Sequence, residues 1–264
     1  MKRKIGFIGC GKMAGAIIEG IKDEGYIISG SEYSQESALN AQNRLGIDVI
    51  TDNIELVKIS DVVFIATKPN QVTGVLSQIK DVITSEKLIV SIAAGVTTEK
   101  IESLLTNVGI VRVMPNTPAL VKSGMFGICG GKYATEADVD FVSTLLSSIG
   151  KCIIVNEDQM DVVTAISGSG PAFFYQVIED MARAGEKLGL DYEKSLVLAT
   201  QTAIGSAQMI FNRGEVPVQD LIDNVATKGG CTFVGIEEMK KYDSSKIFFD
   251  VIDKTAKKAN ELGK

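Results

Sequence analysis

One segment near the N-terminus constrains the fold most. The apolar run Lys4–Ile8 leads directly into Gly-Cys-Gly-Lys-Met-Ala at residues 9–14, where a helical pattern begins. In such a G-x-G-x-x-A sequence the first glycine permits a tight turn, the second lets the backbone approach a pyrophosphate, and the small third residue lets helix and strand pack closely. The N–H groups and the dipole of the helix N-terminus favour phosphate. The segment therefore predicts that the chain binds a nicotinamide dinucleotide.

The first part of the chain alternates short apolar runs with helical patterns. The runs that predict strands are 4–8, 26–29, 62–66, 88–92, 110–113, 127–130 and 152–155. The patterns that predict helices are 13–23, 35–45, 71–82, 98–105 and 136–148. This alternation predicts an α/β fold, a Rossmann-like, doubly wound parallel sheet covered by helices on both faces.

Strand patterns stop after about residue 160. Pro171 can open a helix that ends near Gly189, and Asp191 can cap the next, which runs to Phe211. Pro217 starts a third, and two more follow an interruption at Gly229–Gly230. We therefore expect a dinucleotide-binding domain at 1–158 and an all-α domain at 159–264. The apolar stripes of the second domain are numerous, and they pack either in an intrachain core or against a second subunit.

Composition excludes several classes of function. Asp and Glu total 33 against 27 Lys and Arg, a net charge of −6, so the surface repels nucleic acid. No apolar run approaches the roughly 20 residues of a membrane helix. The four cysteines form no C-x-x-C pair, which argues against a disulfide framework or zinc site and favours a cytoplasmic location. The chain has no histidine, so we predict neither a histidine acid–base nor a metal centre.

The residues after the second predicted strand bear on the choice of cofactor. Glu32 is an acidic residue at the position that usually binds the adenine ribose 2′-hydroxyl of NAD. Ser31, Ser34 and Asn53 could instead hydrogen-bond a 2′-phosphate. A solvated loop carboxylate explains Glu32 equally well, so NADH and NADPH both stay open.

Three further loops follow predicted strands, at Ala66–Pro69, Ala93–Gly95 and Met114–Pro118. The carboxyl ends of parallel strands face the ligand crevice, so these loops should line the nicotinamide side. Ordinary turn chemistry would explain any one of them alone.

The helical region carries two runs of small residues, Ser167–Phe173 and Thr227–Thr232. The second interrupts two helices, and free N–H groups at a new helix start are suitable carboxylate ligands. The Thr232 hydroxyl could donate to a substrate nitrogen. The alternative is a flexible loop in which Thr232 only caps the helix.

Taken together, these motifs resemble the pyrroline-5-carboxylate reductase family. They occur in order from Ile5 to about Met239 as F-I-G-x-G-x-M-A, A-T-K-P, S-I-A-A-G-V, M-P-N-T-P, S-G-S-G-P-A-F and K-G-G-C-T. The resemblance implies reduction of 1-pyrroline-5-carboxylate to L-proline, the last step of proline biosynthesis, by hydride transfer from NADPH or NADH to the cyclic imine carbon. It also implies homodimers formed through the C-terminal helices, which in some members assemble into a homodecamer, a pentamer of dimers.

The resemblance also implies roles for individual positions. Cofactor-binding positions are Ile8, Gly9, Gly11, Lys12, Met13, Ser31, Asn53, Ala66, Lys68, Pro69, Ala93, Gly95 and Asn224. Substrate-binding positions are Gly230, Cys231 and Thr232, with Glu215 approaching from a partner subunit, and Thr232 is the catalytic hydrogen-bond donor. The family commonly has proline where this chain has Lys228. The lysine adds a cation near the expected carboxylate, where it either aids binding or, as we expect, points to solvent.

Three alternatives compete with this interpretation. A β-hydroxyacid dehydrogenase would need a catalytic lysine where this chain has Phe174, whose ring cannot transfer a proton. A non-catalytic redox regulator would bind the dinucleotide but would not need Gly229–Thr232. Cys231 could be a nucleophile, because a helix N-terminus can lower a thiol pKa, although no histidine is present to activate it.

Overall fold

A computed structural model describes residues 3–263. It comprises two compact units, one that extends to Ser169 and includes the end of the chain from Asp253, and one formed by Gly170–Ile252. The division falls after Ser169, past residue 158, because the turns that follow Met160 pack on the first unit, where Met160 and Ala165 are fully buried. The domain boundaries expected from the sequence stay a prediction.

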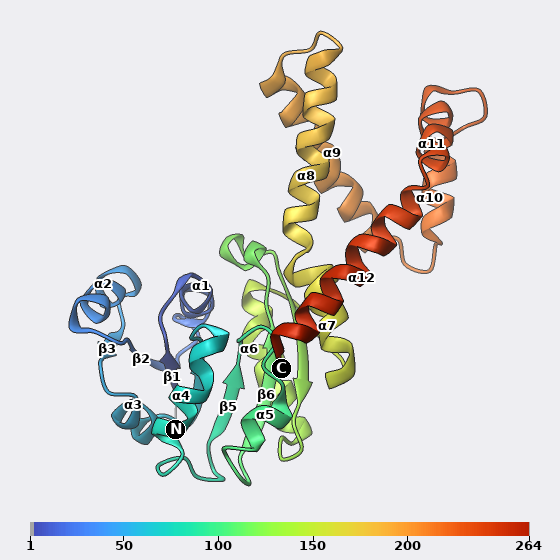
Figure 1. The fold of residues 1–264 in the computed structure, drawn as a ribbon. Coiled ribbons are helices and arrows are strands. Elements are labelled where there is room, and N and C mark those ends of the chain that lie inside the picture. Colours follow the sequence, from blue (N-terminus) through green and yellow to red (C-terminus); the bar gives the residue numbers. More distant parts are fainter. Residues whose placement is uncertain (1–2, 264) are drawn as a thin grey trace. The chain divides into compact units, whose positions relative to one another are not determined.

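The first unit is built on an eight-stranded sheet with the order β3-β2-β1-β4-β5-β6-β7-β8 (Figure 1). Its strands are β1 (Lys4–Ile8), β2 (Ile27–Ser31), β3 (Asp48–Ile50), β4 (Val62–Ile65), β5 (Leu88–Ser91), β6 (Gly109–Met114), β7 (Gly124–Gly130) and β8 (Gly150–Ile154). The strands from β3 to β6 in that order are parallel. The predicted doubly wound parallel sheet is confirmed, with one antiparallel pairing, between β6 and β7. The link between them is too short for the crossover of a dozen or more residues that parallel neighbours need.

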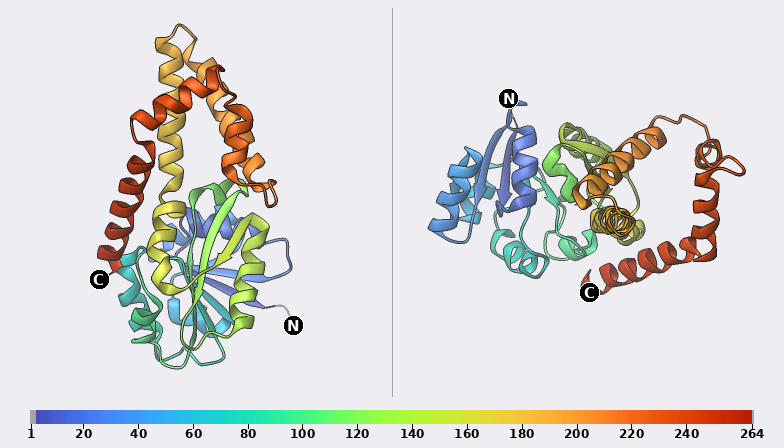
Figure 2. Two further views of the ribbon diagram at one scale, coloured as in Figure 1. Left: turned by 90° about the vertical axis from the view of Figure 1, so that its right-hand side faces the viewer. Right: turned by 90° about the horizontal axis from the view of Figure 1, so that it is seen from above.

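Helices cover both faces of this sheet (Figure 2). They are α1 (Lys12–Ile21), α2 (Gln35–Leu45), α3 (Asn53–Ile59), α4 (Pro69–Ile79), α5 (Thr98–Glu102), α6 (Glu136–Leu146) and α7 (Met160–Val163). Side chains fix several starts, since Ser34, Asp52 and Thr135 each accept hydrogen bonds from first-turn N–H groups. The sequence patterns missed α3 and β3, both of which are short.

Two apolar clusters hold the sheet between its helices. Phe7 of β1 and Phe64 of β4 stack with ring centroids 4.5 Å apart in one cluster. Ile8 and Ile65, the next residues along the same strands, belong to the other. Successive strand residues point to opposite faces, so strands buried on both faces must be apolar throughout. This is why β1 and β4 read as continuous apolar runs.

The second unit is helical. It contains α8 (Gly170–Lys187), α9 (Tyr192–Phe211), α10 (Val218–Val225) and α11 (Cys231–Lys241), and α12 (Ser244–Gly263) begins in it. The helices α8 and α9 pack against each other. A Cβ on Gly185 would lie 2.5 Å from the Ser195 hydroxyl oxygen, so only small residues permit this close approach.

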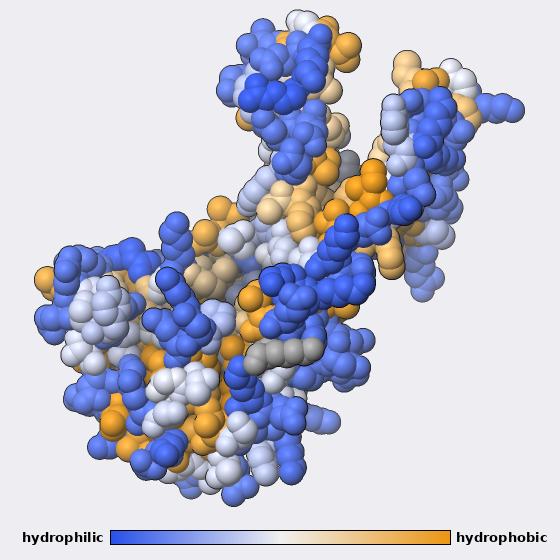
Figure 3. Space-filling view, viewed as in Figure 1, coloured by the Kyte–Doolittle hydropathy of each residue, from blue (hydrophilic) through white to orange (hydrophobic). Residues whose placement is uncertain are grey.

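Much of the apolar surface of this unit is not buried within one chain. Phe174, Val197 and Phe249 are 66%, 65% and 69% exposed, and hydrophobic side chains appear in orange among the polar residues of these helices (Figure 3). Neither α10 nor α11 has a buried residue. Apolar faces on this scale are typical of protein–protein interfaces. Within residues 3–263, no helix combines the length and hydropathy needed to cross a membrane.

Candidate functional site

The glycine-rich loop joins β1 to α1, and its two glycines meet different constraints. Gly9 has a φ of +89°, and a Cβ there would lie 3.0 Å from the Ala66 carbonyl oxygen. Its N–H donates to the Ser31 carbonyl at 2.9 Å. Gly11 is the N-cap of α1 with φ −67°, and no atom lies within 4 Å of its would-be Cβ. Gly9 is thus required by the turn, whereas Gly11 leaves the backbone open to a ligand.

A cavity of about 870 Å³ opens beside this loop, at the carboxyl ends of β1, β2 and β4. Its size lies within the range of cofactor pockets. It brings together several residues for which the sequence predicts cofactor binding. These are Ile8, Gly9, Gly11, Ser31, Asn53, Ala66 and Lys68.

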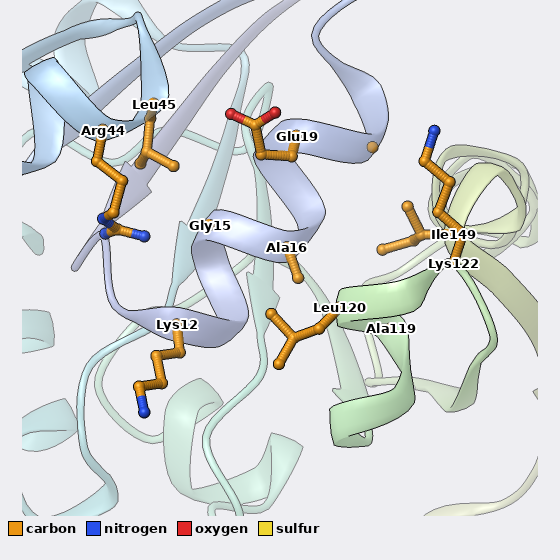
Figure 4. Close-up of a pocket in the computed structure, with 11 residues that line it drawn as sticks. Lys12, Gly15, Ala16, Glu19, Arg44, Leu45, Ala119, Leu120, Lys122 and Ile149 are labelled. Atoms are coloured by element: carbon orange, nitrogen blue, oxygen red, sulfur yellow. The ribbon is translucent and has the colours of Figure 1, made fainter.

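The structure places the other predicted cofactor residues of this unit outside the cavity lining. Met13 packs against the apolar core, Pro69 is the first residue of α4, and Ala93 and Gly95 follow β5. Lys12 lines a separate cavity of about 260 Å³ between α1, α2 and the turn at 117–121 (Figure 4).

One face of α4 contributes lining residues that the sequence analysis missed. Gln71, Val75 and Gln78 recur at helical spacing and all line the cavity. The helical spacing of these residues is visible in the sequence. It could not identify them as lining residues, because the face of α4 that lines the cavity depends on how the helix packs on the sheet.

Two local features test whether the cavity suits a dinucleotide. The backbone at Gly11 is unobstructed. The Thr67 hydroxyl is buried in the cavity wall and has no hydrogen-bond partner among residues 3–263. Buried polar groups normally find partners, so an orphaned hydroxyl in a cavity wall fits a site that a polar ligand completes. The residues present therefore fit the cofactor.

Glu32, which directly follows β2, contacts the glycine-rich loop through its carboxylate. Its Oε1 accepts a hydrogen bond from the Cys10 N–H at 2.7 Å. Burial, followed by the charge of Glu32, raises the pKa of the Cys10 thiol to about 12. Because the thiolate is the reactive form, Cys10 is a packing residue rather than a nucleophile.

The loop after β6 is held to the end of the first unit. Asn116 Oδ1 accepts from the Met125 N–H at 2.8 Å, and Asn116 Nδ2 donates to the Ser167 hydroxyl at 3.4 Å. Ser167 lies in a π-helical turn, Thr164–Gly168, a distortion common at functional sites. Two motifs that are far apart in the sequence thus meet in one unit.

The remaining predicted residues belong to the second unit and are mostly exposed within it. Glu215 lies in the loop after α9, and Asn224 lies in α10. Gly230 is the N-cap of α11, and Cys231 and Thr232 are its first residues. Thr232 is therefore not the cap, and no described side chain caps this helix. Its first-turn N–H groups lack intrahelical acceptors and can bind an anion. Lys228 is exposed, as expected.

Two family models match the chain. Residues 157–262 match the model described as pyrroline-5-carboxylate reductase dimerisation, so the C-terminal region is a dimerisation domain and the chain forms a homodimer. Residues 4–95 match the model described as NADP oxidoreductase, coenzyme F420-dependent. The cofactor is accordingly a nicotinamide dinucleotide, NADPH or NADH, and the fold class is as the sequence predicts, apart from β7.

Relatives match over the full length. The pyrroline-5-carboxylate reductase of Methanosarcina acetivorans is 40% identical, with 99% of this chain and 98% of the relative covered. The solved structure of the Coxiella burnetii pyrroline-5-carboxylate reductase has a TM-score of 0.92 at 32% identity and covers 100% of both chains. The Plasmodium falciparum pyrroline carboxylate reductase, solved with NADP bound, has a TM-score of 0.86 at 33% identity and covers 99% of this chain and 98% of its own.

Proposed function

Because this chain belongs to the pyrroline-5-carboxylate reductase family and reduces 1-pyrroline-5-carboxylate to proline, we propose how its residues divide that work. The cavity beside the glycine-rich loop holds the cofactor, and the start of α11 holds the substrate. When bound, the nicotinamide supplies the hydride that the cyclic imine carbon receives. The full-length relationship to named reductases, together with a cavity of suitable size at the loop, carries this proposal.

In the proposed cofactor site, α1 and the loop before it bind the pyrophosphate. The open backbone at Gly11 and the free N–H groups at the start of α1 support this assignment. Lys12 and Met13 belong to that first turn, and we assign them to the site through their backbone N–H groups. Ser31 and Asn53 contact the adenosine end. The residues that contact the nicotinamide end are Ala66, Lys68, Pro69, Ala93, Gly95 and Asn224.

In the proposed substrate site, the N–H groups of Cys231 and Thr232 bind the substrate carboxylate. The Gly230 N–H, which the sequence also suggested for this role, instead donates to the Thr227 carbonyl at 2.9 Å. The Thr232 hydroxyl donates a hydrogen bond to the imine nitrogen and orients the ring. A threonine hydroxyl is a poor acid, so its role is orientation and relay, and the proton comes from water or from an already protonated imine. Glu215 of a partner subunit approaches the same substrate.

The family resemblance and the cysteines support two proposals, on assembly and on location. We propose that homodimers associate further into a pentamer of dimers, which light scattering would report as a decamer mass.

We also propose a cytoplasmic location, supported by the four cysteines, all of which are free thiols: Cys10, Cys129, Cys152 and Cys231. Cell fractionation tests the location.

The assignment of Thr232 is tested by Thr232→Ala, with Thr232→Ser as the matched control. Loss of one positioned donor should lower kcat by roughly a hundredfold. The affinity for NADH and NADPH, measured by fluorescence, should not change. Thr232→Ser retains the hydroxyl and should recover most of the lost turnover. Near-normal turnover of Thr232→Ala would show that the hydroxyl is not the donor.

A further inference from the structure

Glu32 lies at the end of the cavity where the adenosine of a dinucleotide belongs. It directly follows β2, and its own N–H donates to the Ile50 carbonyl of β3 at 2.9 Å. Its carboxylate is anchored by Oε1 on the Cys10 N–H, at 2.7 Å. No hydrogen bond of the described residues engages Oε2. Glu32 also lines the cavity. Its carboxylate is therefore held in place through Oε1, and Oε2 is available to accept a hydrogen bond from a ligand.

The polar side chains around Glu32 have already paired with one another. The Ser31 hydroxyl, fully buried, donates to Asn53 Oδ1 at 2.7 Å. Asn53 Nδ2 donates to Gln78 Oε1 at 2.9 Å. The Ser34 hydroxyl caps α2 by accepting from the Ser37 N–H at 3.2 Å. The Ser31 hydroxyl hydrogen and one amide hydrogen of Asn53 are thus used within the protein, and Ser34 is not among the described lining residues of the cavity.

Few cationic side chains lie near the adenosine end of the cavity. Among the described lining residues, Lys68 is the one cation. It follows β4, two strands away from β2 in the sheet, which corresponds to roughly 10 Å at ordinary strand spacing. Arg44 donates to the Cys10 carbonyl and lines the separate cavity of Figure 4 instead.

We propose that Glu32 makes the adenosine end of the cofactor site select NADH over NADPH. The free oxygen of the carboxylate accepts a hydrogen bond from the ribose 2′-hydroxyl of NADH. The 2′-phosphate of NADPH would bring a second negative charge against a fixed carboxylate. Lys68 is the one cation among the described lining residues, and the nearby Arg44 is already bound to the Cys10 carbonyl. This inference rests on the proposed cofactor site, and it names the residue that sets the preference of that site.

Equilibrium binding of NADH and NADPH to the full-length protein without substrate tests the proposal. We expect the wild-type protein to bind NADH more tightly, with a Kd for NADPH higher by about tenfold or more. Glu32→Gln removes the charge but keeps an oxygen for the Cys10 N–H. It should lower the Kd for NADPH by about tenfold. It should also raise the Kd for NADH, because the amide nitrogen that replaces Oε2 cannot accept a hydrogen bond from the ribose 2′-hydroxyl.

Glu36→Gln is the matched control, because Glu36 is a carboxylate in the first turn of α2 that does not line the cavity. It should leave the ratio of the two Kd values unchanged. Added salt should narrow the difference between the cofactors in the wild-type protein but not in Glu32→Gln. Equal or tighter binding of NADPH by the wild type, or an unchanged ratio in Glu32→Gln, would overturn the proposal. Failure to bind either cofactor would refute the site itself, and the selectivity with it.

Discussion

The guanidinium of Arg112, a residue of β6 that is 2% exposed, forms an ion pair with the carboxylate of Glu157. Glu157 lies in the short 3-10 helix that follows β8, and its Oε2 also accepts from the Thr98 hydroxyl at 2.8 Å and the Cys129 thiol at 3.3 Å. Three elements of the first unit are therefore tied to the segment that leaves the sheet. The ion pair therefore holds the segment after β8 against the sheet.

Replacing Glu157 by glutamine should destabilise the first unit strongly. The change would leave Arg112 buried without a counter-charge, which costs about 3–5 kcal/mol. Urea denaturation of Glu157→Gln and the wild type measures the difference. Asp158→Asn, an exposed carboxylate next in the sequence, is the control and should cost little. A Glu157→Gln protein as stable as the wild type would show that the pair contributes nothing.

The same pair predicts how stability depends on pH. Burial by itself raises the pKa of Glu157, but the hydrogen bond from Thr98 and the charge of Arg112 outweigh it, so the pKa lies below its ordinary value of 4.5. A carboxyl with a lowered pKa in the folded state stabilises the protein above the unfolded pKa, and this stabilisation is lost as the pH falls through the folded value. The difference in unfolding free energy between the wild type and Glu157→Gln should therefore be constant near neutrality and shrink below pH 4.5. Urea titrations across that range measure it, and a difference that grows on acidification would contradict the assignment.

Alanine at the two loop glycines should separate stability from cofactor binding. Gly9→Ala places a Cβ against the Ala66 carbonyl at a positive φ and should cost about 1–2 kcal/mol of stability. Gly11→Ala meets no protein atom, so stability should be unchanged while the Kd for NADH and NADPH rises by about tenfold or more. Thermal melts and fluorescence titration give the two readouts. Gly205→Ala in α9, which is equally unobstructed but far from the loop in sequence, should leave binding unchanged. Normal binding by Gly11→Ala would remove the loop from the cofactor site.

A charge on the exposed apolar face of α12 should disrupt the homodimer. Phe249 is 69% exposed in one chain, and a buried aromatic at an interface commonly contributes about 2 kcal/mol or more. Sedimentation velocity of Phe249→Glu should show monomers at concentrations where the wild type is dimeric. Leu39→Glu, a change at a 54% exposed residue of α2, should remain dimeric. A dimeric Phe249→Glu protein would exclude Phe249 from the interface.

The elements predicted well are those whose signals are local. The helix 35–45 matches α2 at both ends, because Ser34 caps its start and Gly46, with φ +67°, ends it. The helix 192–211 matches α9, which Asp191 caps. The strand β3 and the helix α3 were missed, since three and seven residues carry too little periodicity. The antiparallel direction of β7 could not be predicted, because strand pairing is set by the fold as a whole.

For the site, the sequence by itself determined the chemistry that repeats in a fixed local order. The glycine pattern at residues 9–14 and the motifs up to Thr232 identified a dinucleotide loop and the family. Only the tertiary structure decided which side chains share the cavity. Gln71 and Gln78 line the cavity beside the loop, whereas Lys12 lines a different cavity. The carboxylate of Glu32 accepts a hydrogen bond from the Cys10 N–H. The physical reason is that a motif specifies backbone conformation over a few residues, whereas contacts between side chains 22 or more positions apart arise when strands and helices pack.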